Sequence, residues 1–364
     1  MRVLAVFGTR PEAIKIAPVL SAAKEAGIDA KVCVTAQHRE MLDQMLEVFG
    51  INADFDLDLM QENQSPLSVA TRVFDALAPV MLSVQPDWLL VQGDTTTAFA
   101  AAFVGYQQRV RVGHIEAGLR TRDKWQPFPE EMNRRLVTAM ADLHFAPTQG
   151  AADALLAEGV AADRIFLTGN TVVDALQEIL KRPATFADTR LKALTGRFVL
   201  LTAHRRENFG ERLEQICLAA SDLLRRFPDV SLVFPVHPNP HVTETAQRIL
   251  GRQPRIVLTG PLSYPDFVHL MKSAVLMLSD SGGVQEEAPS VGTPVLVLRD
   301  VTERPEAVES GWAEVVGTKR TKILEHATAW LERAGGRPSV SKGNPFGDGK
   351  AGARIVSALQ QFRA

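Results

Sequence analysis

The stretch Ala274–Pro289, AVLMLSDSGGVQEEAP, joins a continuous apolar run to residues that can open a helix. The apolar run predicts a buried β-strand, and the glycines after it predict a tight strand-to-helix turn. Gly282 and Gly283 have no Cβ, so a ligand can approach their backbone closely, and the helix N-terminus behind them offers unpaired N–H groups that suit phosphate. Glu287 follows about one helical turn later, where a carboxylate can accept hydrogen bonds from sugar hydroxyls. An ordinary glycine turn with an acidic first helical turn is the alternative interpretation.

Apolar runs of the same kind recur along the chain and alternate with segments of helical length. The predicted strands are Val3–Phe7, Lys31–Thr35, Trp88–Gln92, Val110–Ile115, Leu143–Ala146, Arg164–Thr168, Phe198–Thr202, Ser231–Val236, Arg255–Leu258, Val275–Ser279, Pro294–Leu298 and Ala313–Val316. Most are apolar throughout, which is typical of parallel strands that are covered on both faces. The alternation therefore predicts an α/β fold with doubly wound parallel sheets and right-handed crossovers.

The length of 364 residues favours two domains over one. We place the break within Gly169–Arg197, and we predict a first domain over 1–170, a second over 171–350, and a C-terminal helix over 351–364 that packs back on the first domain. Two doubly wound domains facing each other would put the carboxyl ends of their strands, where ligands bind, on either side of one cleft. A single large sheet is the alternative, although about twelve strands is long for one open sheet.

The composition is that of a soluble globular enzyme. With 40 basic and 42 acidic residues the net charge is −2, which argues against a general electrostatic attraction to nucleic acid. No apolar run approaches the length of a bilayer span, and the N-terminus lacks the pattern of a signal peptide. The only cysteines, Cys33 and Cys217, stand in unrelated apolar contexts, so neither a disulfide framework nor a cysteine-based zinc site is expected. These features predict a cytoplasmic protein that binds neither membrane nor nucleic acid.

Cationic side chains follow several predicted strands. Arg10 and Lys15 lie at a helix start after the first strand, and Arg304 follows Pro294–Leu298. Such positions favour anionic groups, with solvated surface charge as the alternative. The G-x-G-x-x-G fingerprint is missing after the first strand and no P-loop pattern is present, which disfavours an NAD-dependent oxidoreductase and a P-loop kinase.

Three carboxylates also follow predicted strands or turns of the first domain. Asp94 could cap a helix, and Glu116 could form an ion pair with Arg120 or Arg122. Glu130 follows a proline-rich turn. Because parallel strands end at one edge of a sheet, we expect the three acids to converge there and to act as general acids and bases.

Histidines and arginines open the second domain. His204 is followed by two arginines after a predicted strand, where these groups can neutralise a diphosphate or protonate a leaving oxygen. His237 ends the next strand in a proline-fixed turn. A metal site is the competing interpretation of the histidines, but no metal-binding spacing supports it.

Taken together, these motifs make the chain resemble the non-hydrolysing UDP-N-acetylglucosamine 2-epimerases over nearly its entire length. The resemblance rests on Gly8–Glu12, Gln92–Thr95, His114–Arg120, Pro129–Glu131, His204–Glu207, Asp280–Gly283 and Thr302–Glu306. The chain departs from the family pattern at Ala203, where many members have glycine. The resemblance implies two Rossmann-like domains in the GT-B arrangement, usually in a homodimer.

The resemblance also implies a site and an activity. The ligands would be UDP-N-acetylglucosamine and UDP, with no cofactor and no metal, and the product would supply a surface polysaccharide. The implied catalytic residues are Asp94, Glu116, Glu130 and His204, and the residues implied to hold UDP are Arg10, Lys15, Arg134, His204, Ser281, Gly282, Gly283, Glu287 and Arg304. Bacterial members are activated by a second substrate molecule, for which the corresponding positions are Gln37, Gln64, Glu131, Arg206 and His237. Asn63 stands where some members have arginine.

The implied chemistry explains why several acids are needed. No carbonyl neighbours C2 of the sugar, so its proton becomes acidic only when the C1–O bond to UDP breaks. One carboxylate then removes the proton, giving a 2-acetamidoglucal, and another group protonates the opposite face before UDP adds back. The alternatives are a GT-B glycosyltransferase, a hydrolysing 2-epimerase, a 2-epimerase of a modified UDP-sugar, and a non-enzymatic sugar-nucleotide sensor.

Overall fold

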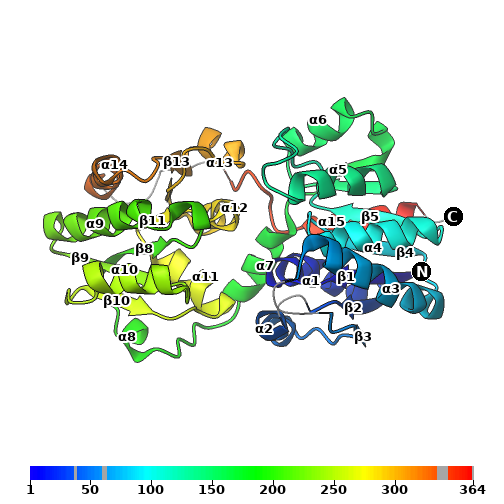
Figure 1. The fold of residues 1–364 in the computed structure, drawn as a ribbon, viewed down its shortest axis with the longest axis horizontal. Coiled ribbons are helices and arrows are strands. Elements are labelled where there is room, and N and C mark those ends of the chain that lie inside the picture. The colour runs from blue at the N-terminus through cyan, green and yellow to red at the C-terminus, as the bar shows by residue number, and fades with distance from the viewer. Residues whose placement is uncertain (37–38, 60–63, 334–342, 363–364) are drawn as a thin grey trace. The chain divides into compact units, whose positions relative to one another are not determined.

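The computed structural model describes residues 1–36, 39–59, 64–333 and 343–362 (Figure 1). Within these ranges the chain forms two compact units, Met1–Ala175 with Phe346–Ala364, and Leu176–Pro345. Each unit contains one sheet in which every strand pair is parallel, with helices between the strands. The predicted α/β class with doubly wound parallel sheets is confirmed.

The first unit has a seven-stranded sheet in the order β3-β2-β1-β4-β5-β6-β7. Its strands are β1 (Arg2–Phe7), β2 (Asp29–Val34), β3 (Phe55–Asp56), β4 (Trp88–Gln92), β5 (Arg111–Ile115), β6 (Leu143–Ala146) and β7 (Ile165–Leu167). Its helices are α1 (Arg10–Glu25), α2 (Arg39–Phe49), α3 (Pro66–Val84), α4 (Thr96–Gln107), α5 (Glu130–Met140), α6 (Gln149–Ala157), the short η1 (Ala162–Arg164) and α15 (Ala351–Gln361). Helix α7 (Thr171–Leu180) contains the division between the two units.

The second unit has a six-stranded sheet in the order β10-β9-β8-β11-β12-β13. Its strands are β8 (Arg197–Thr202), β9 (Val230–Pro235), β10 (Ile256–Thr259), β11 (Leu276–Ser279), β12 (Val295–Val297) and β13 (Ala313–Val315). Its helices are α8 (Thr189–Lys192), η2 (Arg206–Asn208), α9 (Glu211–Arg226), α10 (Pro240–Leu250), α11 (Tyr264–Ser273), α12 (Gly282–Val291), α13 (Pro305–Glu309) and α14 (Arg320–Glu332).

Each of the twelve predicted strands coincides with an observed strand, with ends that differ by at most two residues. The sequence analysis missed β3, a two-residue edge strand that pairs with the end of β2 through Cys33↔Phe55 and Val34↔Asp56. A pairing this short leaves no apolar run to recognise. Short strands are common at the edge of a sheet, because a short edge strand offers little backbone for unwanted pairing with another chain.

Alternating strand residues build the core of each unit. In the first unit Leu4, Val6, Leu89 and Val91 face helices α3, α4 and α5. In the second unit, the corresponding cluster lies under α9, α10 and α14, while α11 and α12 pack on the other face of the sheet. Both faces of each sheet are therefore covered, which explains why the strands are apolar along their whole length.

The C-terminal segment packs on the first unit. Helix α15 lies against α1, and a Cβ added to Gly352 would stand only 2.6 Å from the carbonyl oxygen of Pro18. The Gly352 N–H donates to Asp174 Oδ1 at 2.9 Å, and Arg354 donates to the Thr168 carbonyl at 3.0 Å. Only glycine allows the two helices to approach this closely.

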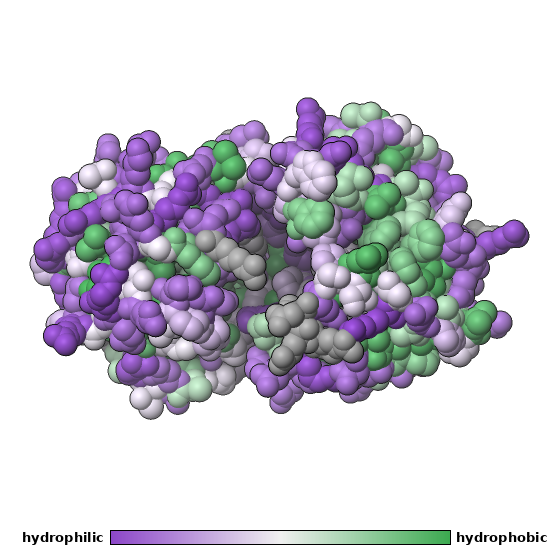
Figure 2. Space-filling view, viewed as in Figure 1, coloured by the Kyte–Doolittle hydropathy of each residue, from purple (hydrophilic) through white to green (hydrophobic). Residues whose placement is uncertain are grey.

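Helix α3 corrects one expectation from the sequence. By length and composition it is apolar enough to cross a membrane, although the sequence analysis found no such run. In the structure its inner face packs on α4 through residues such as Val73 and Leu77, which are fully buried. Its outer face carries the exposed Leu67 and Leu82, and Figure 2 shows apolar surface over α3 and α4. The apolar character thus has two sources, a core face and an exposed face.

Candidate active site

In the first sheet the strand order reverses between β1 and β4, so the loops after these two strands diverge to opposite faces and leave a crevice at the strand ends. The buried carboxylate of Glu12 bridges the two loops. It accepts hydrogen bonds from the N–H groups of Gly8 and Thr9 at 3.0 and 2.8 Å, and from Thr95 Oγ1 at 2.6 Å. Burial raises the pKa of Glu12, and these hydrogen bonds oppose that shift.

Glu116, directly after β5, is held by three donors. Lys15 Nζ lies 2.6 and 2.7 Å from its two oxygens, Asn170 Nδ2 donates at 3.3 Å, and Gln92 Nε2 also donates. Its backbone has φ of 63°, a left-handed conformation that is costly for a residue with a Cβ and persists where the surroundings fix it. These donors fix the position of both carboxylate oxygens at the end of β5.

The ion pair of Glu116 differs from the alternative considered from the sequence. Arg120 does not pair with Glu116. It donates from Nε to Glu158 Oε1 at 2.8 Å and from Nη2 to Thr138 Oγ1 at 2.9 Å. Lys15, which is distant in sequence, takes its place because β1 and β5 both end at this edge of the sheet.

Asp94 lies in the turn between β4 and α4 and is not a helix cap. Thr95 caps α4, since its Oγ1 accepts from the Ala98 N–H at 3.0 Å. The Asp94 carboxylate instead accepts from Arg134, whose Nε and Nη2 each lie 2.7 Å from Oδ2. Asn133 Nδ2 donates to the Asp94 carbonyl at 2.9 Å. Helix α5 thus fixes both the backbone and the side chain of Asp94.

Glu130, the first residue of α5, lines a pocket of about 280 Å³ within the first unit. The lining comes from the loops after β1 and β4, from the start of α3 and from the start of α5: Thr9, Gln64, Pro66, Val69, Thr95, Thr96, Pro129, Glu130 and Asn133. Asp94 immediately precedes two of these residues. The structure therefore brings Asp94 and Glu130 to one edge of the sheet, beside Glu116 at the end of β5.

Two buried histidines, His114 and His144, lie on β5 and β6 near the acids at the carboxyl end of the first sheet. His114, on β5, is fully buried and its Nε2 lies 2.7 Å from the Gly93 carbonyl, in the turn that carries Asp94. Burial lowers the pKa of His114 to about 4, so the imidazole is neutral at pH 7 and Nε2–H can donate to that carbonyl. His144 lies opposite on β6, where burial and its neighbour His114 lower its pKa to about 3.

In the second sheet the order reverses between β8 and β11, and Asp280 bridges the loops after these strands. Its fully buried carboxylate accepts from the His204 N–H, the Arg205 N–H and Asn208 Nδ2, each at 3.0 Å. The His204 Nδ1 lies 3.1 Å from Oδ1. Burial alone would raise the pKa of Asp280, but the contacts with His204 and the other donors hold it below its ordinary value. The ring of His204 is half exposed, so Asp280 orients it without covering it.

The turn after Asp280 has the geometry of an anion site. Ser281 is the N-cap of α12 and makes no side-chain cap, so the first N–H groups of the helix have no such acceptor. A Cβ added to Gly283 would meet only Ser281 Oγ at 3.9 Å and Glu287 Oε2 at 4.0 Å, which are ordinary contacts. The space in front of this turn is therefore open on the protein side, and a ligand can approach the backbone there.

Two residues beside this turn are absent from the set that the resemblance implies for UDP: Arg205, one of the two arginines noted after His204, and Tyr264. A Cβ on Gly282 would lie 3.9 Å from Arg205 Nη2, so this guanidinium reaches the start of α12. Burial lowers the pKa of Arg205, and the positive charge of the nearby Arg299 lowers it further. The Tyr264 O–H donates to Glu287 Oε1 at 2.6 Å and orients that carboxylate. Arg205 belongs to a basic tripeptide that offered a signal, whereas Tyr264 offered none.

Several predicted binding residues have carboxylate partners in the structure. Lys15 contacts Glu116 and Arg134 contacts Asp94, as described, and Arg304 forms an ion pair with the buried Glu286. The Arg304 N–H also donates to Thr302 Oγ1 at 3.1 Å. Arg10 is the first residue of α1, at the carboxyl end of β1. Lys15, Arg134 and Arg304 are therefore held near the strand ends by ion pairs with neighbouring carboxylates.

The residues predicted to bind a second substrate molecule differ in burial, and some of them lie outside the described residues. Glu131 is fully buried and accepts from the Thr121 N–H at 2.9 Å, the Arg122 N–H at 3.3 Å and Arg135 Nε at 3.1 Å, so it supports the backbone of that loop. Gln64 lines the pocket with Glu130. His237 stacks on His204, with ring centroids 6.5 Å apart. Gln37 and the side chain of Arg206 lie outside the described residues, as does Asn63.

In the described part of the chain, no group of three or more histidine, cysteine, aspartate or glutamate side chains is arranged to hold a metal ion. Cys33 and Cys217 are buried free thiols on β2 and α9, and burial raises the pKa of each to about 12. Neither thiol is therefore a reactive nucleophile at neutral pH.

Two doubly wound α/β units, with acids at the switch point of one sheet and an anion-suited turn at that of the other, define a nucleotide-sugar enzyme of the GT-B-like class. The family model described as UDP-N-acetylglucosamine 2-epimerase matches residues 21–360. A curated UDP-N-acetylglucosamine 2-epimerase from Escherichia coli O157:H7 is 48% identical, over 100% of this chain and 99% of the relative.

Solved structures of UDP-GlcNAc 2-epimerases are also similar to this chain. A UDP-GlcNAc 2-epimerase from Neisseria meningitidis, bound to UDP-GlcNAc, is 46% identical with a TM-score of 0.91, over 99% of this chain and 100% of that one. The Methanocaldococcus jannaschii enzyme, in complex with UDP-GlcNAc and UDP, is 34% identical with a TM-score of 0.85, over 99% and 100% of the two chains. The chain belongs to the UDP-N-acetylglucosamine 2-epimerase family, and both the predicted resemblance and the GT-B-like fold are confirmed.

Proposed function

We propose that this protein interconverts UDP-N-acetylglucosamine and UDP-N-acetylmannosamine by eliminating UDP and adding it back. The observation that carries the proposal is the set of acids at the carboxyl edge of the first sheet, with Glu116 clamped by Lys15 in a left-handed backbone conformation. Backbone strain of this kind is retained where function requires a fixed side chain. Family membership gives the proposal its substrate, because relatives of this chain have been solved with UDP-GlcNAc and with UDP.

The nucleotide is assigned to the second unit. The N–H groups at the start of α12 and the Arg205 guanidinium bind the diphosphate, and Glu287, oriented by Tyr264, accepts from the ribose hydroxyls. Arg304 adds positive charge at a strand end of this unit. Arg10 has the corresponding position at the end of β1 in the first unit. His204, oriented by Asp280, stabilises the leaving phosphate. These groups lower the cost of breaking the C1–O bond, because they stabilise the charge that develops on UDP.

The proton transfers at C2 are assigned to Asp94, Glu116 and Glu130. When the C1–O electron pair leaves with UDP, an ionised carboxylate takes the C2 proton. The electron pair of the broken C2–H bond then forms the C1–C2 double bond of 2-acetamidoglucal. Protonation of C2 from the opposite face and attack of UDP on C1 complete the exchange. Lys15 and Arg134 act as positioning residues, since each holds in place the acid with which it pairs.

The first test is a time course with UDP-N-acetylglucosamine alone in deuterated water. We expect UDP-N-acetylmannosamine with deuterium at C2 and no steady release of UDP, and proton NMR measures both. Asp94→Asn keeps the shape of the side chain but removes its basicity, so turnover should fall at least ~100-fold. Asp163→Asn, an exposed acid in η1, is the matched control. Steady release of UDP would identify a hydrolase instead, and no reaction without an acceptor would identify a transferase or a sensor.

The second test concerns the turn at the start of α12. Gly283→Ala adds a methyl group that meets no protein atom closer than 3.9 Å, so its obstruction falls on the ligand. UDP affinity measured by calorimetry should fall at least ~5-fold, since forcing a methyl into a packed contact costs about 1–3 kcal/mol. Stability should not fall, because alanine is the better helix former. Gly260→Ala is the control, as its Cβ also meets nothing within 4 Å. Unchanged UDP affinity in Gly283→Ala would remove this turn from the site.

We also propose a homodimer that forms through the apolar outer surface of α3 and α4. Leu82 is 69% exposed and Tyr106 is 59% exposed, and Phe103 beside them packs in an aromatic cluster with Phe74 and Phe99. Exposed apolar area of this kind is typical of association sites, and a second copy would cover it. The resemblance to a family of homodimers supports this choice of partner.

Light scattering in solution tests the dimer. The unaltered protein should show twice the chain mass of 39.8 kDa, and Phe103→Glu/Tyr106→Glu should shift it to the monomer, since burying two charges opposes association. Leu156→Glu on α6 is a matched control, because Leu156 is 46% exposed away from this surface. A dimer that survives the double substitution would place the interface elsewhere.

Activation by a second substrate molecule remains a prediction. Gln64 and His237 are its accessible described candidates, whereas the buried Glu131 would act by holding its loop. The test runs the reaction from UDP-N-acetylmannosamine. A lag that traces of UDP-N-acetylglucosamine abolish would support the site, and full initial velocity without a lag would contradict it.

We infer a cytoplasmic location from the two buried, unpaired thiols, which suit a reducing compartment. The proposed nucleotide-sugar substrate also fits this location. Fractionation of cells that express the tagged protein tests it, and recovery in the membrane pellet would contradict it.

A further inference from the structure

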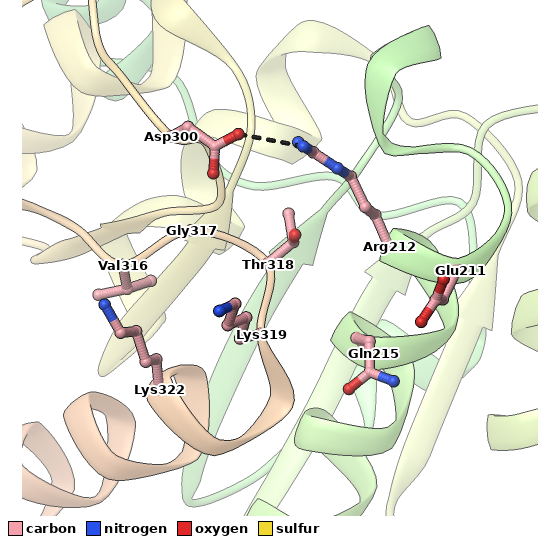
Figure 3. Close-up of a pocket in the computed structure, with 9 residues that line it drawn as sticks. All are labelled: Glu211, Arg212, Gln215, Asp300, Val316, Gly317, Thr318, Lys319 and Lys322. Atoms are coloured by element: carbon pink, nitrogen blue, oxygen red, sulfur yellow. Dashed lines mark ion pairs between the residues drawn. The ribbon is translucent and has the colours of Figure 1, made fainter.

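A second cavity lies at the carboxyl ends of the strands of the second sheet, on the side of α9 and α14. It has a volume of about 500 Å³ and is lined by the first turns of α9 and α14 and by the loops after β12 and β13: Glu211, Arg212, Gln215, Asp300, Val316, Gly317, Thr318, Lys319 and Lys322 (Figure 3). The proposed nucleotide site begins α12, whereas α9 and α14 pack together against the opposite face. The reaction proposed above uses none of these side chains.

The cavity is rich in donors. Helices α9 and α14 both direct their N-termini at it, and neither N-cap residue, Gly210 or Lys319, provides a side-chain cap. The first backbone hydrogen bonds in the two helices are donated by Glu214 and Ile323, so the N–H groups before them lack helical acceptors. Two converging helix dipoles favour a negative charge at this point.

Side chains strengthen the attraction. Lys319 and Lys322 are exposed, and among the described residues neither has a carboxylate partner. Thr318 is 8% exposed, lines the cavity, and its hydroxyl makes no hydrogen bond within the described chain. In Figure 3 it lies between Arg212 and Lys319. The hydroxyl is not among the buried polar atoms that lack a partner, so it is accessible from the cavity that Thr318 lines and can bond a ligand oxygen there.

The cavity lining also contains the acids Glu211 and Asp300, which can accept hydrogen bonds from a ligand. Arg212 Nη2 forms an ion pair with Asp300 Oδ2 at 3.1 Å across the cavity, and both side chains are largely exposed. A surface pair of this kind is weak, so an anion can take Arg212 from Asp300. The released Asp300, with Glu211 and Gln215, would then accept hydrogen bonds from ligand hydroxyls. The volume exceeds what inorganic phosphate needs and falls in the range of small-molecule sites.

We propose that this cavity, referred to as the α9–α14 cavity, binds the phosphate monoester of a small polyhydroxy compound, a sugar phosphate. The phosphate lies between the N-termini of α9 and α14 and accepts from Thr318, Lys319, Lys322 and Arg212. The sugar hydroxyls donate to Asp300 and Glu211. This site and the turn at Ser281 use different helices on different faces of the sheet, so one ligand does not fill both.

The test titrates the full-length protein with glucose 6-phosphate, inorganic phosphate and glucose, using calorimetry in the presence of saturating UDP. The UDP occupies the proposed nucleotide site, and its own binding is measured first. We expect glucose 6-phosphate to bind more tightly than phosphate, and glucose not to bind. Lys319→Ala/Lys322→Ala should weaken glucose 6-phosphate at least ~10-fold, which is the scale of lost charge-assisted hydrogen bonds. Thr318→Val, which keeps the shape of the side chain, should weaken it about 5-fold.

Lys192→Ala in α8 is the matched control, since it removes an exposed lysine from the same unit and should leave the affinity unchanged. UDP affinity should be the same in all variants, which shows that each is folded. Absence of glucose 6-phosphate binding, or equal binding by the double-lysine variant and the unaltered protein, would overturn the proposal. Failure of UDP to bind would count against the proposed function alone, and the titration without UDP would still decide the cavity.

Discussion

A buried carboxylate at each switch point is the interaction on which both candidate sites depend. Reversal of strand order forces the loops after two adjacent strands apart, and the ends of those loops need a common acceptor. Asp280 provides it in the second unit by accepting from the backbone at His204 and Arg205. Glu12 provides it in the first by joining Gly8 and Thr95. Without these acceptors the buried N–H groups would be unsatisfied, and the loops that carry functional side chains would not be fixed.

The three acids of the first unit have different surroundings. Glu116 accepts from Lys15, Asp94 accepts from two nitrogens of Arg134, and Glu130 lines a pocket. Three carboxylates close together would repel one another, and the cations Lys15 and Arg134 offset that repulsion. The same cations therefore do more than attract a phosphate, which was the role the sequence analysis gave them. The arrangement suits a reaction that needs proton transfer on two faces of one carbon.

The sequence predicted what depends on local pattern. The continuous apolar runs located every strand of useful length, and Ala274–Pro289 located the turn at α12, because burial and glycine both leave marks in the sequence. The pairing of Lys15 with Glu116 was not predictable, since it depends on two strands distant in sequence ending side by side. The sequence left open the alternative interpretation of Asp94 as a cap, because Thr95, one residue later, has the same capping chemistry and is the observed N-cap. The apolar outer face of α3 was likewise hidden, because core and exposed apolar residues look alike in one sequence.

The central claim is that the bond between C1 and the UDP oxygen breaks during each epimerisation. It is tested most directly with UDP-N-acetylglucosamine that carries ¹⁸O in the bridge between C1 and the β-phosphorus. Free rotation of the β-phosphate of UDP held in the site should move the label into non-bridging positions, and phosphorus NMR of the recovered UDP-sugars detects this. The account predicts scrambled label in both epimers. Label that stays entirely in the bridge while C2 inverts would contradict elimination and re-addition of UDP.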